Sequence, residues 1–177
     1  ECYRIRALAR HQLGNFEKAI RDFNQAVQLD PKDAATFLNR GTSKNAFNDF
    51  AGAIEDYTRS IELKTSSPLA YANRATSKRA LGDFEGAVKD SSRAIELDPK
   101  DAEVHAIRAL AKAALGDTDG ALKDSSRAIE LDPKDGYYPA VRGLVASLKH
   151  EFREALRDLR RSVQLNPHNP GDSHLWI

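Results

Sequence analysis

Two charged residue types recur at a fixed spacing along the chain, and they are the first candidates for chemistry. An arginine is followed sixteen residues later by an aspartate, and this pair returns every 34 residues. The arginines are Arg6, Arg40, Arg74, Arg108 and Arg142, and the aspartates are Asp22, Asp56, Asp90, Asp124 and Asp158. Because a guanidinium binds a carboxylate through two parallel hydrogen bonds, the pattern predicts ion pairs that tie helices together, within a unit or to the next one. The alternatives are solvated surface charges and a ligand-binding role. Three lysines one turn after the arginines are expected to compete for the same aspartates: Lys44, Lys78 and Lys112.

Residue types that serve catalysis occur in the chain, but without the partners that catalysis needs. Cys2 has no histidine at a recognisable spacing. The segment 116–120, GDTDG, has the composition of a calcium loop without its spacing. His168 and His174 flank Asp172 as possible metal ligands, with no second element to complete a site. The sequence therefore predicts no enzyme, no cofactor and no metal site.

The elements that must position these residues follow from an internal repeat. The stretch KDSSRAIELDPKD at 89–101 returns letter for letter at 123–135. A 34-residue period is typical of helical-hairpin repeats. Within each unit, apolar residues recur at helical spacing in two segments of about 14 residues. The predicted units are 1–33, 34–67, 68–101, 102–135 and 136–169, followed by a tail, 170–177, that is expected to begin one more helix.

Turn and capping residues predict where the helices begin and end. A left-handed residue should close the first helix of each unit: Gly14, Asn48, Gly82, Gly116 and His150. The next residue should cap the second helix, as Asn15, Asp49, Asp83 and Asp117 can. A proline should stop that helix at Pro31, Pro99, Pro133 and Pro167. Caps for the following first helices are Asp33, Ser67, Asp101, Asp135 and Asn169, and Pro68 is expected as a first helical residue.

These features resemble the tetratricopeptide repeat. Three small positions of that family's pattern recur in every unit: the series Ala7, Gly41, Ala75, Ala109 and Gly143, the series Ala19, Ala53, Ala87, Ala121 and Ala155, and the series Ala26, Ser60, Ala94, Ala128 and Ser162. The resemblance covers residues 1–169 of the 177. It implies an all-α, right-handed solenoid of five antiparallel helix-turn-helix repeats, in which the first helices line a concave groove.

Two departures from the family's pattern predict local changes. The aromatic residue of the second helix, present as Phe23 and Tyr57, is replaced by Ser91 and Ser125 in the two near-identical units. Pro139 stands where an aromatic residue is usual, near the start of the fifth unit's first helix. Because proline lacks an amide donor, this helix is expected to start late.

The resemblance places partner-binding residues along the groove. Its middle is polar, and asparagine side chains there suit an extended peptide because each can donate to and accept from a peptide backbone. The polar positions are Asn39, Thr42, Asn45, Asn73, Thr76 and Arg79. The last two units present an apolar strip, which usually marks a contact surface: Ile107, Leu110, Tyr137, Val141, Leu144 and Leu148. The alternative is that this strip touches the next repeat or a missing C-terminal helix.

The second helix of the last unit is basic. Spacings of three and four place its arginines on one broad face: Arg153, Arg157, Arg160 and Arg161. They form either a solvated face or a dock for an acidic protein surface, whose binding would weaken with salt. Nucleic acid is not expected, because no aromatic residues interleave with these arginines. A carboxylate clamp, used by some members of the family, lacks its basic residues here, since Leu38, Leu69, Glu103 and Ile107 occupy those places.

Composition sets the remaining bounds. The net charge is +1 and there is one cysteine, so neither a whole-molecule nucleic-acid footprint nor an internal disulfide is expected. No apolar run approaches the roughly 18 residues of a membrane span, and no signal peptide is visible. Since the chain contains no methionine and opens in helical phase, we expect a piece of a longer protein. The cytoplasm is slightly favoured, although an export signal could be missing.

The sequence therefore predicts a non-catalytic scaffold or adaptor, of a kind typical of bacterial arrays, that binds a partner protein or peptide in the groove or along an edge. Three alternatives stay open. The chain could self-assemble into a homo-oligomer, or could be the regulatory array of a larger enzyme. It could also dock an acidic cytoskeletal filament through its basic last unit, in the manner of kinesin light chains. The resemblance also allows envelope adaptors and organelle scaffolds.

Overall fold

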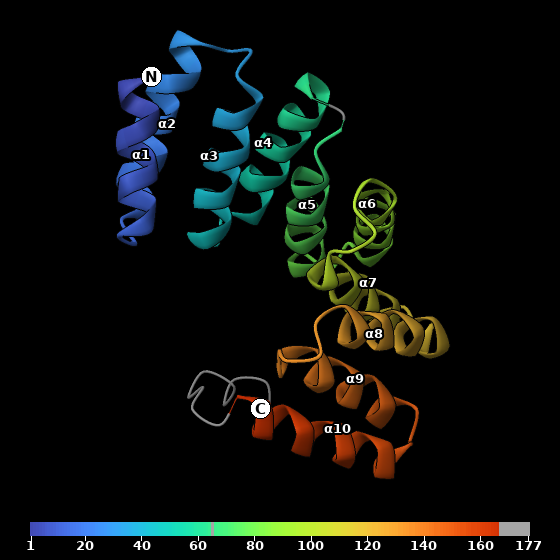
Figure 1. Ribbon diagram of the computed structural model, residues 1–177. Coiled ribbons are helices and arrows are strands. Elements are labelled where there is room, and N and C mark those ends of the chain that lie inside the picture. The colour runs from blue at the N-terminus through green and yellow to red at the C-terminus, as the bar shows by residue number, and fades with distance from the viewer. Residues whose placement is uncertain (65, 167–177) are drawn as a thin grey trace. The chain divides into compact units, whose positions relative to one another are not determined.

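The computed structural model of the chain is helical throughout the part that it describes, residues 1–64 and 66–166. This part contains ten α-helices in five helix-turn-helix pairs (Figure 1). They are α1 (Cys2–Gln12), α2 (Phe16–Leu29), α3 (Ala34–Ala46), α4 (Phe50–Leu63), α5 (Pro68–Ala80), α6 (Phe84–Leu97), α7 (Ala102–Ala114), α8 (Thr118–Leu131), α9 (Tyr137–Leu148) and α10 (Phe152–Leu165). The predicted all-α fold of paired helices is confirmed. None of the helices described has both the length and the apolarity to cross a lipid bilayer.

The helices group into two compact units, Glu1–Pro99 with α1 to α6, and a second unit that begins at Lys100 and contains α7 to α10. Within the first unit each helix packs on the next one in the chain, and α3 also contacts α1 and α5. Within the second unit α7 to α10 pack in the same succession, and α7 also contacts α9. The first helices of neighbouring repeats therefore lie side by side within each unit (Figure 1).

The turns between paired helices have the predicted left-handed residues. Gly14, Gly82 and Gly116 have φ angles of 73°, 82° and 84°. Asn48 and His150 adopt the same conformation, with φ of 62° and 63°, in the second and fifth repeats. An L-residue pays a steric cost there that glycine avoids, and asparagine and histidine tolerate the conformation better than most residues. All five predictions are confirmed.

Aspartate caps the second helix in three of the repeats. Oδ1 of Asp49, Asp83 and Asp117 accepts the amide of the residue three positions later, at 2.9–3.0 Å. Asn15 occupies the same place before α2, but its side chain forms no capping hydrogen bond, so that prediction is wrong. The helices α2, α6 and α8 end two residues before a proline, as expected. The predicted stop at Pro167, the cap at Asn169, the tail helix and the tail's metal ligands lie outside the described residues.

The first helices are capped by Asp33, Ser67 and Asp101, whose side chains each accept a backbone amide, and Pro68 begins α5 as predicted. Asp135 does not cap the fifth one. Gly136 takes the N-cap position of α9, and Asp135 Oδ1 accepts the amide of Tyr137 at 2.9 Å. In the repeat register α9 starts one residue later than α3, α5 and α7, which confirms the late start predicted from Pro139.

Small residues are buried where the two helices of a repeat cross. In the first, third and fourth repeats the residue is alanine, and Ala7, Ala75 and Ala109 are 0% exposed. The second and fifth repeats have Gly41 and Gly143, which are also buried. Close approach of the helices requires a residue with little or no side chain at this position, so the family's small positions have a packing role.

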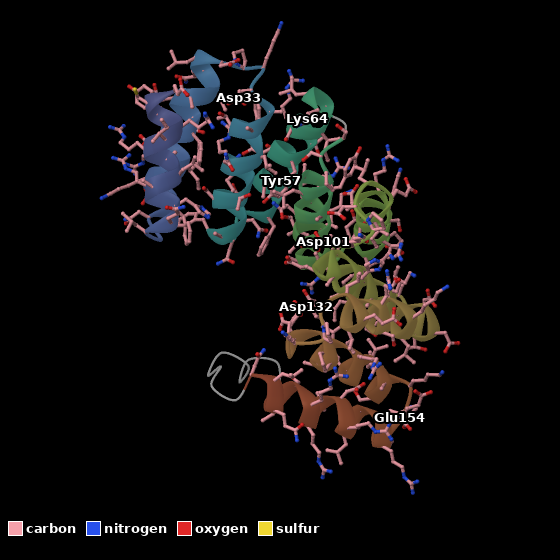
Figure 2. All side chains as sticks on the ribbon, viewed as in Figure 1. Asp33, Tyr57, Lys64, Asp101, Asp132 and Glu154 are labelled. Carbon is pink, nitrogen blue, oxygen red and sulfur yellow. The ribbon has the colours of Figure 1, made fainter. Side chains whose placement is uncertain are left out.

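The size of the facing residue explains the glycine in the second repeat. Tyr57, which Figure 2 labels, is 1% exposed, and a Cβ added to Gly41 would lie 2.8 Å from its ring. Where serine replaces the aromatic residue, alanine fits: Ser91 and Ser125 lie in the repeats of Ala75 and Ala109 and are fully buried. The first repeat combines Ala7 with the buried ring of Phe23, so the glycine of the second repeat is explained by the close approach of the Tyr57 ring and not by an aromatic residue alone.

Candidate functional site

The five predicted Arg–Asp pairs are present, and each lies within one repeat. In the third repeat, Nε of Arg74 donates to Oδ2 of Asp90 at 2.7 Å, and Nη2 donates to Oδ1 at 2.7 Å. The other four pairs have the same two-pronged geometry at 2.6–2.8 Å. The aspartates are only 2–4% exposed, so the arginines replace the water that these carboxylates lose. The structural pairs are confirmed, and the alternative of solvated charges is wrong for the aspartates.

The remaining guanidinium nitrogen links a repeat to the one before it. Nη1 of Arg74 donates to Oγ1 of Thr58 at 3.0 Å. The same contact joins Arg40 to Asn24 at 3.0 Å and Arg142 to Ser126 at 3.4 Å. The acceptor is a neutral side chain of the preceding second helix in each case. One arginine therefore fixes the register both within its repeat and across the junction.

The lysines were expected to compete with the arginines for the aspartates, but they share the carboxylates with them. Lys78 Nζ lies 2.9 Å from Oδ2 of Asp90, the oxygen that also accepts Arg74 Nε. The second and fourth repeats repeat this arrangement with Lys44 and Lys112, at 3.0 and 2.8 Å, and Arg10 supplies the second cation in the first repeat at 2.6 Å. The fifth repeat has Ala146 in this position, so only the arginine is available there.

The ion pair of Asp124 makes the stability of the array depend on pH. Burial of Asp124 opposes its ionisation, but hydrogen bonds from Arg108 and Lys112 outweigh that cost, so the pKa of Asp124 lies below its usual value. A carboxyl whose pKa is lowered by folding stabilises the folded state above its unfolded pKa of about 3.9 and loses this contribution as the pH falls through the folded value.

We therefore expect Asp124→Asn to lower the melting temperature at pH 7 and to have a smaller effect below about pH 4. Thermal unfolding followed by circular dichroism gives the melting temperatures of the unmodified chain and of the Asp124→Asn variant from pH 7 to pH 2.5. All other ionisable groups are common to the two chains, so the difference between their melting temperatures reports on position 124. If Asp124→Asn lowered the melting temperature equally at pH 7 and pH 2.5, the ion pairs of the Asp124 carboxylate would not be the source of the stabilisation.

The polar residues predicted for the groove lie together on α3 and α5, and several are engaged within the array. Nδ2 of Asn73 donates to Oγ1 of Thr42 at 3.5 Å, and Oδ1 of Asn45 accepts from Ser77 at 2.8 Å. Thr42 and Thr76 each donate to a backbone carbonyl of their own helix. The two contacts between side chains join α3 to α5. Part of the hydrogen-bonding capacity that suits a bound peptide is therefore used between neighbouring repeats.

Asn39 and Arg79 complete this polar set, and both side chains are partly exposed. Nε of Arg79 is buried and has no hydrogen-bond acceptor within the described part of the chain. A buried N–H without an acceptor is costly, so this position would favour an added acceptor.

Two members of the predicted apolar strip are not exposed. Ile107 is 6% exposed and Val141 is 4% exposed. Val141 belongs to the core of the second unit, where it packs with Tyr138 and Val145 against Ile129. The expectation that these two residues are exposed is therefore wrong, because they lie on a covered side of their helices. Tyr137, Leu144 and Leu148 are 37%, 42% and 52% exposed, as predicted.

An apolar pocket of about 120 Å³ lies between α9 and α10. Its walls include Leu110, Tyr137 and Leu144 from the predicted strip, together with Leu159 and Val163 of α10. Val141 also lines it. The structure therefore brings four predicted apolar residues to one pocket. Its chemistry suits an apolar side chain, because few polar groups line it.

Sequence reasoning missed Leu159 and Val163, although the repeat register contains a signal for both. Val163 occupies the position of Ile61 and Ile129, which are 8% and 6% exposed, yet Val163 is 64% exposed. Leu159 replaces the serine found in the two preceding repeats. Ile61 and Ile129 are each followed by a further described repeat and are buried, whereas Val163 belongs to the last described repeat and is exposed. An exposed apolar residue at this position therefore marks an open surface at the end of the described array.

The basic face on α10 is present at the rim of this surface. Arg153, Arg157 and Arg160 are exposed, and Arg161 is partly covered and donates from Nη2 to the carbonyl of Pro133 at 3.3 Å. Exposed apolar side chains lie among them, with Leu156 at 50% and Phe152 at 64%. The pocket and the arginines thus belong to one end of the described chain. We call this region the end surface, and it consists of Tyr137, Leu144, Leu156, Leu159 and Val163 with Arg153, Arg157, Arg160 and Arg161.

Groups that would suggest catalysis or metal chemistry do not come together. In the part of the chain that the structure describes, no three His, Cys, Asp or Glu side chains are arranged to hold a metal ion. Cys2 is a free, exposed thiol. The segment 116–120 contains the turn between α7 and α8 and the start of α8, with Asp117 acting as a helix cap.

Comparison with known proteins places these features in a family. A model described as "TPR repeat" matches residues 7–43, and one described as "Tetratricopeptide repeat" matches residues 73–136. The search of curated proteins found no match.

Solved structures share the fold at low sequence identity. MamA from Desulfovibrio magneticus RS-1 is 16% identical, with a TM-score of 0.86 and 96% of each chain covered. YrrB, described as a TPR protein with an unusual peptide-binding site, is 20% identical, with a TM-score of 0.76 over 98% of this chain and 89% of its own. TTC0263, a thermophilic TPR protein of Thermus thermophilus, is 17% identical, with a TM-score of 0.76 over 94% of this chain and 91% of its own.

Proposed function

This chain belongs to the tetratricopeptide repeat family, whose repeats are protein-interaction scaffolds, and from that premise we propose that it is a non-catalytic adaptor that holds a partner protein at the end surface. The apolar pocket between α9 and α10 receives an apolar side chain of the partner. The Arg–Asp pairs keep the helices in register, so that the pocket is formed before the partner arrives.

The observation that carries this proposal is the exposure of apolar residues around one pocket. Leu144 is 42% exposed and Val163 is 64% exposed, and both line the pocket. Exposed apolar residues scattered singly are normal, whereas a contiguous apolar patch with a polar rim is typical of a contact surface. YrrB, which is similar in fold, is described by its peptide-binding site, and a bound peptide or protein is the ligand class we infer here.

Leu144→Lys tests the pocket, and Leu115→Lys is its matched control. Leu115 is 43% exposed and lies outside the pocket, and the equivalent position of the last repeat is naturally Lys149. We expect crosslinking capture to recover a partner with the unmodified chain and with Leu115→Lys, and to lose it with Leu144→Lys. Circular dichroism of all three chains checks that they remain helical.

Capture of the partner by all three chains would contradict the pocket as the binding site, and would direct attention to the polar residues of α3 and α5. Recovery of the chain crosslinked only to itself, with a mass that rises with concentration in light scattering, would replace the adaptor by a self-assembling scaffold.

A further inference from the structure

The contacts between one repeat and the next show which groups a helix needs in order to pack on the second helix of a repeat. At the junction of α8 with α9, Arg142 donates to Ser126 across the boundary, and Ile129 of α8 belongs to one buried apolar cluster with Tyr138, Val141 and Val145 of α9. The junctions of α2 with α3 and of α4 with α5 have the same polar contact, from an arginine to a neutral oxygen. A helix that continues the array therefore brings an arginine to a neutral acceptor, beside an apolar contact.

The end surface keeps the apolar part of this junction. Val163 stands at the position of Ile129, and Leu156 stands at the position of Leu122, which packs against the core of the second unit. Val163 and Leu156 are 64% and 50% exposed. Covering them would remove apolar surface from water, which favours binding.

The polar part of the junction differs, because a cation stands where the inner junctions have a neutral acceptor. Arg160 stands at the position of the acceptor Ser126. Two neighbouring charges change in the same direction, because Arg153 replaces Asp119 and Gln164 replaces Glu130, whereas Glu154 replaces Gly120. The four arginines of α10 share that helix with only two carboxylates, those of Glu154 and Asp158, and Asp158 is already paired with Arg142. The end surface has therefore lost its acceptor and has gained donors.

A helix that follows the repeat pattern would meet repulsion at this surface. Its arginine would approach Arg160, and two like charges brought together at an interface cost affinity. The same holds for a second copy of this chain stacked in the repeat register, because Arg6 of α1 would occupy that place. The charge on α10 thus disfavours both a further repeat of the same pattern and end-to-end stacking of copies.

We propose that the end surface binds an amphipathic α-helix of a partner protein that has an apolar stripe and, where the repeats have their arginine, a carboxylate. The apolar stripe covers Val163 and Leu156 and fills the pocket beside Leu144. The carboxylate accepts from Arg160, a pairing that is stronger than a neutral hydrogen bond. This inference rests on the proposed adaptor function and adds the partner's chemistry.

Two synthetic peptides provide the test. One has the sequence of α9, Tyr137–Leu148, which packs on α8 in this chain, and the other differs only by Arg142→Glu. Fluorescence anisotropy measures their binding to the 177-residue chain at low salt. We expect the Glu peptide to bind about tenfold more tightly than the Arg peptide and to lose much of that preference in about 0.3 M salt, which screens exposed charges.

The variant Arg160→Ser restores the acceptor of the inner junctions and should abolish or reverse the preference for the Glu peptide. Arg127→Ser is the matched control, since it removes one exposed arginine from α8 without touching the end surface, and should leave the preference unchanged. Equal binding of the two peptides, a preference that survives Arg160→Ser, or no binding of either peptide would overturn the inference. In each of these cases the capture experiment remains a separate test of the adaptor function. If Leu144→Lys abolishes capture of the partner there, the adaptor function stands, and only a partner helix with a carboxylate opposite Arg160 is excluded.

Discussion

Replacing Arg74 by alanine should lower the free energy of unfolding by about 3 kcal/mol or more, which is the cost of leaving a buried charge without its partner. Asp90 is 2% exposed and accepts two hydrogen bonds from this arginine. Lys78 stays 2.9 Å from the carboxylate and compensates for part of the loss. The contact of Arg74 with Thr58 across the junction is lost as well. Urea unfolding followed by circular dichroism measures the change.

Arg59→Ala is the matched control for this prediction. Arg59 forms an ion pair with Glu62 at 2.9 Å, and the two side chains are 47% and 56% exposed. Exposed pairs of this kind contribute about 0.5 kcal/mol or less. If Arg74→Ala were no more destabilising than Arg59→Ala, the Arg–Asp pairs would not be structural ties.

Tyr57→Ser should destabilise the chain by about 3 kcal/mol or more, because it leaves a cavity where a fully buried ring was. Gly41→Ala should destabilise by about 1–3 kcal/mol, because the added Cβ would lie 2.8 Å from that ring. The double substitution reproduces the combination of alanine and serine found at Ala75 with Ser91 and at Ala109 with Ser125. We expect it to be clearly less destabilising than the sum of the single changes.

A double-mutant cycle in urea gives the coupling between the two positions. Tyr57 also places its hydroxyl 3.5 Å from Thr42, so Tyr57→Phe is included to separate this contact from packing. Additive effects of the two substitutions would show that Gly41 is not adapted to the tyrosine.

Because the sequence repeats, most helix boundaries and turns of this structure could be predicted from it. A residue's backbone conformation at a turn or a helix end depends mostly on its own type and its near neighbours. The positive φ of Gly14 and Asn48, the caps at Asp49 and Asp83, and the late start of α9 could therefore be predicted. Asn15 and Asp135 were predicted as caps and do not cap their helices. The helices that follow them, α2 and α9, form nevertheless.

The Arg–Asp pairs could be predicted because a strict period places both partners on facing helices in every repeat. Only the structure showed that Arg74 has a third contact across the junction to Thr58, and that Lys78 joins the pair without displacing it. The orientation of a guanidinium depends on all the groups around it, and these come from three helices.

For the candidate site, the sequence by itself determined which positions of α3, α5, α7 and α9 are polar or apolar and that α10 is basic. The tertiary structure decided which of these positions are accessible. Val141 is covered and Val163 is open, although both are valines on helices of the same repeat, because Val141 faces the preceding repeat and Val163 faces the side on which no described helix packs. Burial depends on what lies across an interface, and the residue's own type and spacing do not contain that information.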